Sequence, residues 1–175
     1  MQITRNSISA MTGLRILPPD RSAAIRDTVC SILGVTTFIV VLDALVFRAH
    51  LPRPYIALYT SPLMPRLWVI SVMAGIEEIK FRLILMTGLA LLFSLGRGRL
   101  TTPAAIAIIL AAQFANVGHI VLADPVYGTL RYWLVGCVWG WLYWRHGWLT
   151  AFVGHVATHP VLDPALLFAF THIAT

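Results

Sequence analysis

Two glutamates, a lysine and an arginine interrupt a long apolar stretch over residues 67–95, at Glu77, Glu78, Lys80 and Arg82. If the stretch is a helix, Glu77 lies about 15 Å from its start, near the middle of a bilayer. One charged side chain at that depth costs about 2.5–3.5 kcal/mol, so four of them need compensating contacts. Ionisable groups at membrane depth are functional by default, and the alternative is a structural ion-pair cluster that fixes helix packing.

Helical spacing separates the two glutamates. Glu78 and Arg82 are four residues apart, so they share a helix face and can form an ion pair. Glu77 points about 100° away from Glu78 and lacks that partner. Burial favours its neutral form, whereas the nearby cations Lys80 and Arg82 favour the carboxylate. A carboxylate balanced in this way can act as a general base that activates water, which is the role predicted for Glu77.

Three histidines in the second half of the chain could complete such a site. His119 follows Asn116 by three residues, so these two side chains share a helix face. His155 and His159 are four residues apart and share a face in the same way. A single buried histidine is more often a hydrogen-bonded core residue, but three of them beside a buried pair of glutamates favour chemistry.

Two chemistries fit these residues. In the first, Glu77 activates water without a metal, and the histidines position the water or stabilise the oxyanion. In the second, zinc generates the hydroxide, and its ligands are Glu77, His119, His155 and His159. The chain has no His-Glu-x-x-His signature, and Pro160 directly after His159 disturbs the local helix. The sequence therefore favours a site without a metal or other cofactor, with zinc as the alternative.

The composition of this 175-residue chain indicates that its solvent is a bilayer. Hydrophobic residues make up 58% and charged residues only 11%, against about a quarter charged in soluble domains. The net charge of +6 comes from arginines that lie mostly between apolar runs, as topology signals do. The chain has no Gly-rich phosphate loop and no nucleic-acid motif, so we expect no nucleic-acid partner.

Capping residues followed by proline predict helix starts, because proline suits the first helical turn and Ser, Thr or Asp suits the N-cap. They occur at Ser61-Pro62, Thr102-Pro103, Asp124-Pro125 and Asp163-Pro164. With the apolar runs they predict helices over 28–47, 62–95, 103–122, 125–145, 147–159 and 164–173, and a polar, proline-rich connection over 48–61. The predicted fold is all-α, a polytopic transmembrane helix bundle of five to six membrane helices, because helices satisfy their own backbone hydrogen bonds in lipid.

The chain is divided into a basic N-terminal segment, 1–27, and a single membrane domain, 28–175. Seven arginines fall in segments on the N-terminal side of the bilayer, which favours a cytoplasmic N-terminus. Four fall on the other side, namely Arg48, Arg53, Arg66 and Arg131. Asp43 is expected at the interface. An interfacial aromatic belt is expected at Trp139, Trp141, Tyr143, Trp144 and Trp148. Close helix contact is expected at Gly136 and Gly140.

The order of the polar residues resembles the CAAX protease and bacteriocin-processing family (CPBP, or Abi) of intramembrane endopeptidases. Its Glu-Glu-x-x-x-Arg motif is matched by Glu77, Glu78 and Arg82. His119 matches the histidine of its second motif, and His155 matches the histidine that follows a Gly-containing helix and a turn. The resemblance covers about residues 67–160, which form the protease-like core.

Two positions depart from the family pattern. Ala115 replaces the usual phenylalanine four residues before His119, and Phe114 lies one position early. His159 stands where the family has Asn or Asp, and a histidine can also donate or accept a hydrogen bond. Its role in this chain is therefore an open question.

The resemblance implies that Glu77 is the water-activating base, that Glu78 and Arg82 support it, and that two histidines bind the scissile carbonyl or its oxyanion. These histidines are His119 and His155. It also implies a bundle of membrane helices around a water-filled cavity.

We therefore expect an intramembrane endopeptidase that cleaves a peptide or protein tail near or within the bilayer. We expect it in a bacterial inner membrane, in contact with a peptide substrate and lipid. Two alternatives stay open. One is a non-catalytic membrane protein of the same fold, such as an immunity or partner-binding protein. The other is a bis-histidine haem protein.

Overall fold

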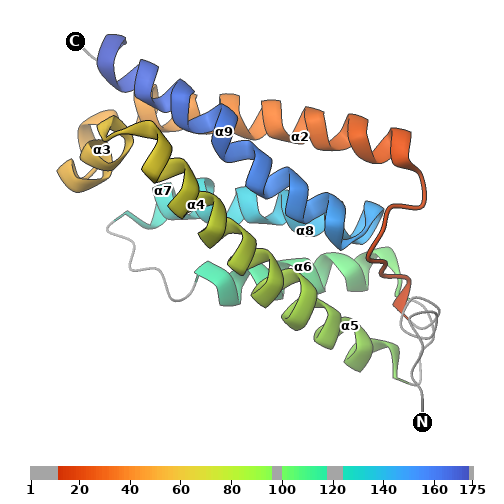
Figure 1. The fold of residues 1–175 in the computed structure, drawn as a ribbon. Coiled ribbons are helices and arrows are strands. Elements are labelled where there is room, and N and C mark those ends of the chain that lie inside the picture. The colour runs from red at the N-terminus through yellow and green to blue at the C-terminus, as the bar shows by residue number, and fades with distance from the viewer. Residues whose placement is uncertain (1–11, 96–99, 118–123, 174–175) are drawn as a thin grey trace.

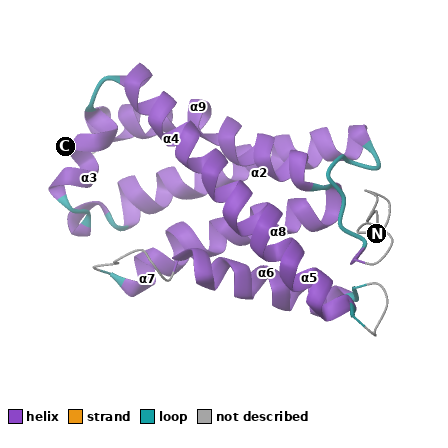
Figure 2. Cartoon of the chain, turned by 60° about the horizontal axis from the view of Figure 1, so that its bottom comes forward, coloured by secondary structure: helices purple, strands orange, loops and turns teal. Residues whose placement is uncertain are grey.

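The computed structural model describes residues 12–95, 100–117 and 124–173, and all regular secondary structure among them is helical (Figure 2). These residues form five long runs, some of which change between α-helical and π-helical hydrogen bonding. In chain order they are α2 (Arg21–Val41) with η1 (Leu42–Val46); α4 (Leu63–Glu77) with η3 (Glu78–Met86) and α5 (Thr87–Ser94); α6 (Thr102–Val117); α7 (Pro125–Gly128) with η4 (Thr129–Leu134) and α8 (Val135–His146); and α9 (Trp148–His172). The predicted all-α fold class is confirmed for the described residues.

The five runs pass in alternating directions between two ends of the molecule (Figure 1). Helices α2, α6 and α9 begin at the end where α5 and α8 finish. The short helices α3 (Arg53–Thr60) and α7 lie at the opposite end, together with the C-terminus (Figure 1). Helix α9 packs against α2, α4 and α8, so residues along its length can contact several other runs.

Three of the predicted helix boundaries are wrong. The first helix begins at Arg21, seven residues before the predicted start at residue 28. The connection over 48–61 contains α3, whose first turn includes Pro54, a position where the missing N–H of proline is tolerated. The predicted break after residue 159 is absent, because α9 continues to His172 with Pro160 and Pro164 inside it. The predicted helix over 103–122 is observed as α6 to Val117, and residues 118–123 lie outside the described part of the chain.

Helix α9 continues through its prolines because tertiary packing outweighs the lost backbone hydrogen bonds. Each proline removes one donor from the helix ladder. Leu162 and Leu166 follow Pro160 and are 1% and 0% exposed, so both side chains gain close van der Waals contacts inside the bundle. Inside a bundle, neighbouring helices also compensate for helix-breaking residues. His155 consequently lies well inside a long helix, and not near the end of a short one.

The predicted aromatic belt is only partly at the surface. Trp139 and Tyr143 are 1% and 3% exposed and belong to the core. The hydroxyl of Tyr143 is hydrogen-bonded to that of Thr87 at 2.7 Å, which joins α8 to α5. Trp141, by contrast, is exposed, as the prediction of a belt requires. The belt prediction is therefore wrong for Trp139 and Tyr143, because both side chains pack toward α9 and α5.

Gly136 and Gly140 allow α6 and α8 to approach closely, as their spacing predicts. A Cβ on Gly136 would overlap the side-chain amide of Gln113. A Cβ on Gly140 would lie 2.8 Å from Cγ2 of Ile109, closer than real Cβ contacts allow. Both contacts are with α6, so glycine at these positions sets the distance between the two helices.

Gly147 makes the turn between α8 and α9. Its φ of 103° lies in the region that favours glycine. A Cβ there would also lie 3.0 Å from the carbonyl oxygens of Arg15 and Leu17. The carbonyls of Arg15 and Ile16 accept hydrogen bonds from the first backbone N–H groups of α9, both at 2.9 Å. The segment before α2 therefore caps α9 and closes one end of the bundle.

Within the described residues, one continuous helical run is both long and apolar enough to cross a bilayer, namely Arg21–Val46, and it lies near the N-terminus. The run from Leu63 to Ser94 is longer, but it carries the charged groups around Glu77. Large apolar side chains on its outer surface are exposed, including Trp68 at 74% and Leu92 at 65%. Arg66, Glu78 and Arg82 of this run are therefore directed inward and many of its large apolar residues outward, whereas Lys80 is exposed.

Candidate active site

The carboxylate of Glu78 is the centre of a buried polar network. Glu78 begins η3 and is 0% exposed. Its Oε1 lies 2.8 Å from Nδ1 of His155 and 3.4 Å from Nη1 of Arg82. The i,i+4 pair expected from the sequence is therefore present, and a histidine of α9 joins it. The indole N–H of Trp148 donates to the backbone carbonyl of Glu78 at 3.2 Å, which adds a second link to α9.

Arg82 connects this network to α6 and α8. Its Nη2 donates to Oε1 of Gln113 and to the backbone carbonyl of Gly136, both at 2.9 Å. The amide of Gln113 donates in turn to the carbonyl of Tyr132 at 3.2 Å. Arg82 is 2% exposed, and a guanidinium so deeply buried needs such partners. Arg82 and Gln113 therefore hold the helices around Glu78 in place.

Glu77 differs from its neighbour in burial and in partners. It ends α4 and is half-buried, and no hydrogen bond or ion pair joins its carboxylate to another described residue. It lines a cavity of about 110 Å³ whose wall also includes Arg82, Asn116, Arg131 and His155. A water molecule occupies about 30 Å³ of liquid, so this cavity has room for a few waters. An unpaired carboxylate therefore faces a space that can hold its substrate water.

His155 reaches the cavity from the middle of α9 in a fixed orientation. Its ring stacks on Trp139, with the centroids 5.5 Å apart and the planes 13° apart. Its Nδ1 is hydrogen-bonded to the carboxylate of Glu78. Nε2 is then the ring nitrogen without a partner among the described residues.

His159 lies one turn after His155 but faces a second ion pair. Its Nδ1 is 3.4 Å from Oδ1 of Asp163, whose Oδ2 accepts from Nε of Arg66 at 3.1 Å. Asp163 is 0% exposed and Arg66 is 4% exposed. The rings of His155 and His159 have centroids 5.8 Å apart, and His159 is not part of the cavity wall. The structure therefore brings His159 close to His155 but not to Glu77.

A third buried cluster joins η1, α3 and η4. Asp43 is 0% exposed, so it is enclosed by the bundle and does not lie on its surface. It accepts hydrogen bonds from Tyr55 at 2.5 Å, Tyr127 at 3.0 Å and Arg131 at 3.3 Å. Nη2 of Arg131 donates to the hydroxyls of Tyr55 and Tyr59, each at 3.3 Å. The ion pair with the carboxylate of Asp43 stabilises Arg131 inside the bundle. The sequence signal for this cluster was an aspartate within an apolar run near several tyrosines.

The sequence predicted Arg66 and Arg131 to lie in loops, but both side chains lie inside the bundle. Each is at least nine-tenths buried and paired with a buried aspartate. Of the four arginines assigned to the outer segments, Arg48 and Arg53 consequently remain there. Arg15 and Arg145 are exposed at the other end of the bundle.

Of the four candidate zinc ligands, His119 lies outside the described residues. Among the residues that are described, no group of three or more His, Cys, Asp and Glu side chains could hold a metal ion. Nδ1 of His155 and Nδ1 of His159 each lie beside a different carboxylate, and not beside a common position for a metal ion.

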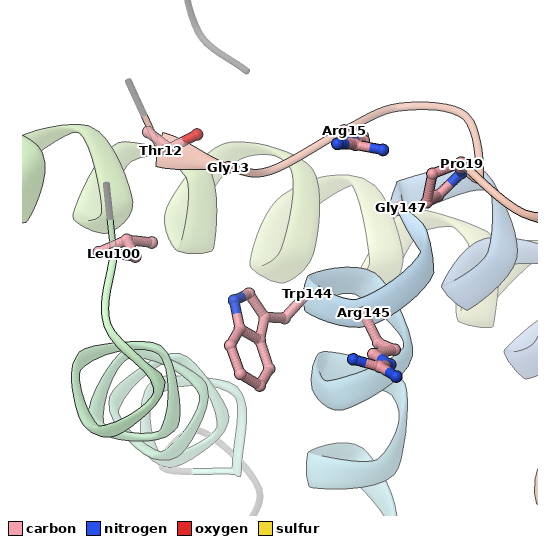
Figure 3. Close-up of a pocket in the computed structure, with 8 residues that line it drawn as sticks. All are labelled: Thr12, Gly13, Arg15, Pro19, Leu100, Trp144, Arg145 and Gly147. Carbon is pink, nitrogen blue, oxygen red and sulfur yellow. The ribbon is translucent and has the colours of Figure 1, made fainter. Parts of the chain in front are cut away.

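A second, larger pocket of about 300 Å³ lies away from these residues, where the segment before α2 crosses the end of α8 (Figure 3). Arg15, Trp144, Arg145 and Gly147 are on its wall. It contains no carboxylate and no histidine among its lining residues. The smaller cavity beside Glu77 is therefore the candidate active site, although the larger one has more volume.

Comparison with known proteins identifies one family. The family model described as Type II CAAX prenyl endopeptidase Rce1-like matches residues 59–161 of the chain. The match includes Glu77, Arg82, Asn116 and His155, so it spans the whole cavity wall described above. No curated protein and no solved structure matches the chain.

Proposed function

Because the chain belongs to the type II CAAX prenyl endopeptidase Rce1-like family, a family of integral membrane proteases, we propose that it hydrolyses peptide bonds with Glu77 as base. One observation supports this assignment above the others. Of two adjacent carboxylates, Glu78 is buried and paired, whereas Glu77 is unpaired and faces a cavity with room for water. An unpaired carboxylate beside water has the position that a general base requires.

The chemistry follows from that position. Glu77 takes a proton from a cavity water, and the resulting hydroxide attacks the carbonyl carbon of the scissile peptide bond. The tetrahedral intermediate collapses, the C–N bond breaks, and the proton held by Glu77 passes to the leaving amine. The products are a new carboxylate and a new amino terminus, and no metal takes part in this scheme.

The supporting residues have separate roles in this proposal. Glu78 and Arg82 hold α4, α6, α8 and α9 around the cavity, and Glu78 also orients His155. Nε2 of His155, which has no partner among the described residues, is free to hydrogen-bond the attacking water. We retain His119 as a group that contacts the substrate, on the strength of the motif that it matches.

We further propose that all five helical runs cross the membrane as a polytopic bundle. The alternating runs, the inward charges and the outward apolar residues support this arrangement. The basic end, with Arg15 and Arg145, then faces the cytoplasm of a bacterial cell. The substrate is a small peptide or a protein tail that enters the cavity near or within the bilayer.

The test is co-expression with a library of short membrane-tethered peptide reporters. The wild type should cleave some of them, Glu77→Gln should cleave none, and Arg53→Gln should behave as the wild type because Arg53 is exposed and lies outside the cavity wall. All three proteins are checked for equal expression. Cleavage that survives in Glu77→Gln would overturn the proposed mechanism. Loss of cleavage with a zinc chelator would favour the zinc alternative.

A non-catalytic immunity or partner-binding protein of the same fold predicts a different result. Such a protein would cleave no reporter, and its biological effect would persist in Glu77→Gln. The two outcomes separate the proposed protease from this second candidate function.

A further inference from the structure

Asn116 has an unusual position in the cavity wall. It lies in the last turn of α6 and is only 5% exposed. Its Oδ1 is buried without a hydrogen-bond partner, and no described residue accepts a hydrogen bond from its NH₂ group. The side chain lines the same cavity as Glu77 and His155.

Gln113, one turn earlier on α6, provides the comparison. It is also an amide, it is 3% exposed, and it lines the same cavity. Its oxygen accepts from Arg82 and its nitrogen donates to the carbonyl of Tyr132. The two amides are therefore similarly buried, but Gln113 uses both its oxygen and its nitrogen in hydrogen bonds, whereas Asn116 uses neither. A buried amide without partners destabilises a fold, so the unpartnered Asn116 calls for a functional explanation.

Two other donors without a hydrogen bond line the same cavity, Nη1 of Arg82 and the indole N–H of Trp139. Nη1 of Arg82 lies 3.4 Å from the carboxylate of Glu78, with which it forms an ion pair. Nη2 of Arg82 and the amide of Gln113 donate to helix partners, and Nδ1 of His155 is hydrogen-bonded to Glu78. Arg131 donates to Asp43 and to two tyrosines. The indole N–H of Trp139 is also unbonded, but its ring lies stacked against His155. Among the described residues that line the cavity, Asn116 is the amide that has neither a hydrogen bond nor an ion pair, so its NH₂ group is free to donate to a ligand.

Hydrolysis places a negative charge on the carbonyl oxygen of the substrate. A preorganised donor at that oxygen stabilises the tetrahedral intermediate, and removal of one such donor typically lowers kcat by about 100-fold or more. We propose that the NH₂ group of Asn116 donates to the scissile carbonyl oxygen and to the oxyanion that forms from it, which makes Asn116 a catalytic residue. This inference rests on the proposed function of the cavity.

The first measurement is thermal unfolding, which does not depend on activity. Asn116→Leu replaces an unpartnered amide by an apolar side chain of similar size, so its Tm should equal or exceed that of the wild type. Gln113→Leu breaks two hydrogen bonds and leaves Arg82 short of an acceptor, so its Tm should fall by several degrees. An equal fall in both variants would show that Asn116 is structural and would overturn the proposal.

The second measurement is cleavage of a reporter peptide that the wild type processes. Asn116→Leu should lower kcat by about 100-fold with KM changed less than about threefold. In a Glu77→Gln background, the same change should weaken binding of the uncleaved peptide by less than about threefold, whereas the affinity of a phosphinic peptide analogue should fall in parallel with kcat/KM. Undiminished kcat in Asn116→Leu would overturn this inference and leave Glu77 as base. If the wild type cleaves no reporter, both the role of Asn116 and the proposed role of Glu77 as base would be overturned.

Discussion

Glu77 and Glu78 are neighbours in sequence, but the helix directs their carboxylates into different surroundings. Glu78 has a guanidinium and an imidazole within 3.4 Å, whereas Glu77 faces the cavity without an ionic partner among the described residues. A rotation of about 100° per residue is sufficient to produce this difference. The pair therefore combines a structural carboxylate with a free one at a single position along the helix.

This difference predicts opposite effects on stability. Glu78→Gln removes the charge that compensates Arg82, and breaking such a buried pair destabilises by about 3–5 kcal/mol. Glu77→Gln breaks no pair, so it should leave stability unchanged while it abolishes cleavage. Thermal unfolding of both variants in the same detergent checks this expectation. Equal stability of the two variants would contradict the assigned roles.

At the scale of elements, α9 is the helix that links the polar clusters. His155, His159 and Asp163 follow one another at intervals of four residues and reach Glu78 and Arg66 on the second run. The same helix had to continue through Pro160 and Pro164 for Asp163 to meet Arg66. The Arg66–Asp163 pair therefore fixes the register of α9 against α4.

Removal of Asp163 tests this role. Asp163→Ala leaves Arg66 buried and uncompensated, so we expect a loss of about 3–5 kcal/mol of unfolding free energy. The double variant Arg66→Met with Asp163→Leu should recover most of the loss, because two apolar side chains replace the pair without leaving a charge. Unfolding and cleavage are measured together, and a single variant as stable as the wild type would contradict the prediction.

The contact between α6 and α8 gives a second prediction at this scale. Gly136→Ala introduces a methyl group that overlaps Gln113 and displaces it from Arg82, so both stability and cleavage should fall. Gly88→Ala is the matched control, because a Cβ at Gly88 has no neighbour within 4 Å. In a helix this control should gain about 0.5–1 kcal/mol. Unfolding curves of the two variants should therefore shift in opposite directions.

At the scale of the whole molecule, the basic residues mark one end of the bundle. Arg15 and Arg145 are exposed near the start of α9, and the C-terminus lies at the opposite end (Figures 1 and 3). Two of the arginines first assigned to the far side are buried, which strengthens the charge difference between the ends. This asymmetry supports a cytoplasmic N-terminus.

Reporter fusions in bacteria check that orientation. Alkaline phosphatase should be active when fused after His50 or after Ile173 and inactive after Leu95, and green fluorescent protein should show the reverse pattern. The expected signs follow from the alternation of the runs between the two ends. An active phosphatase after Leu95 would reverse the orientation, and identical signs after Leu95 and Ile173 would contradict five crossings.

Local information in the sequence was sufficient for several conclusions. The Glu-Glu-x-x-x-Arg motif and the histidines that follow predicted a family that the match over residues 59–161 confirms. Capping residues before proline predicted the starts of the second, third and fourth long runs to within one residue, although of the three predicted caps only Asp124 accepts hydrogen bonds from the first turn of its helix. The Glu78–Arg82 pair and the glycines of α8 were predictable because both depend on spacing within one helix.

Only the tertiary structure decided which polar groups meet across helices. The contacts of Glu78 with His155, of Arg66 with Asp163 and of Arg131 with Asp43 join residues 77, 97 and 88 positions apart. Such pairings depend on helix packing, which no local pattern encodes. Packing also carried α9 through its prolines and left Asn116 unpartnered beside Glu77. The sequence by itself determined which groups are available for catalysis, and the packing of helices determined which of them remain free to act.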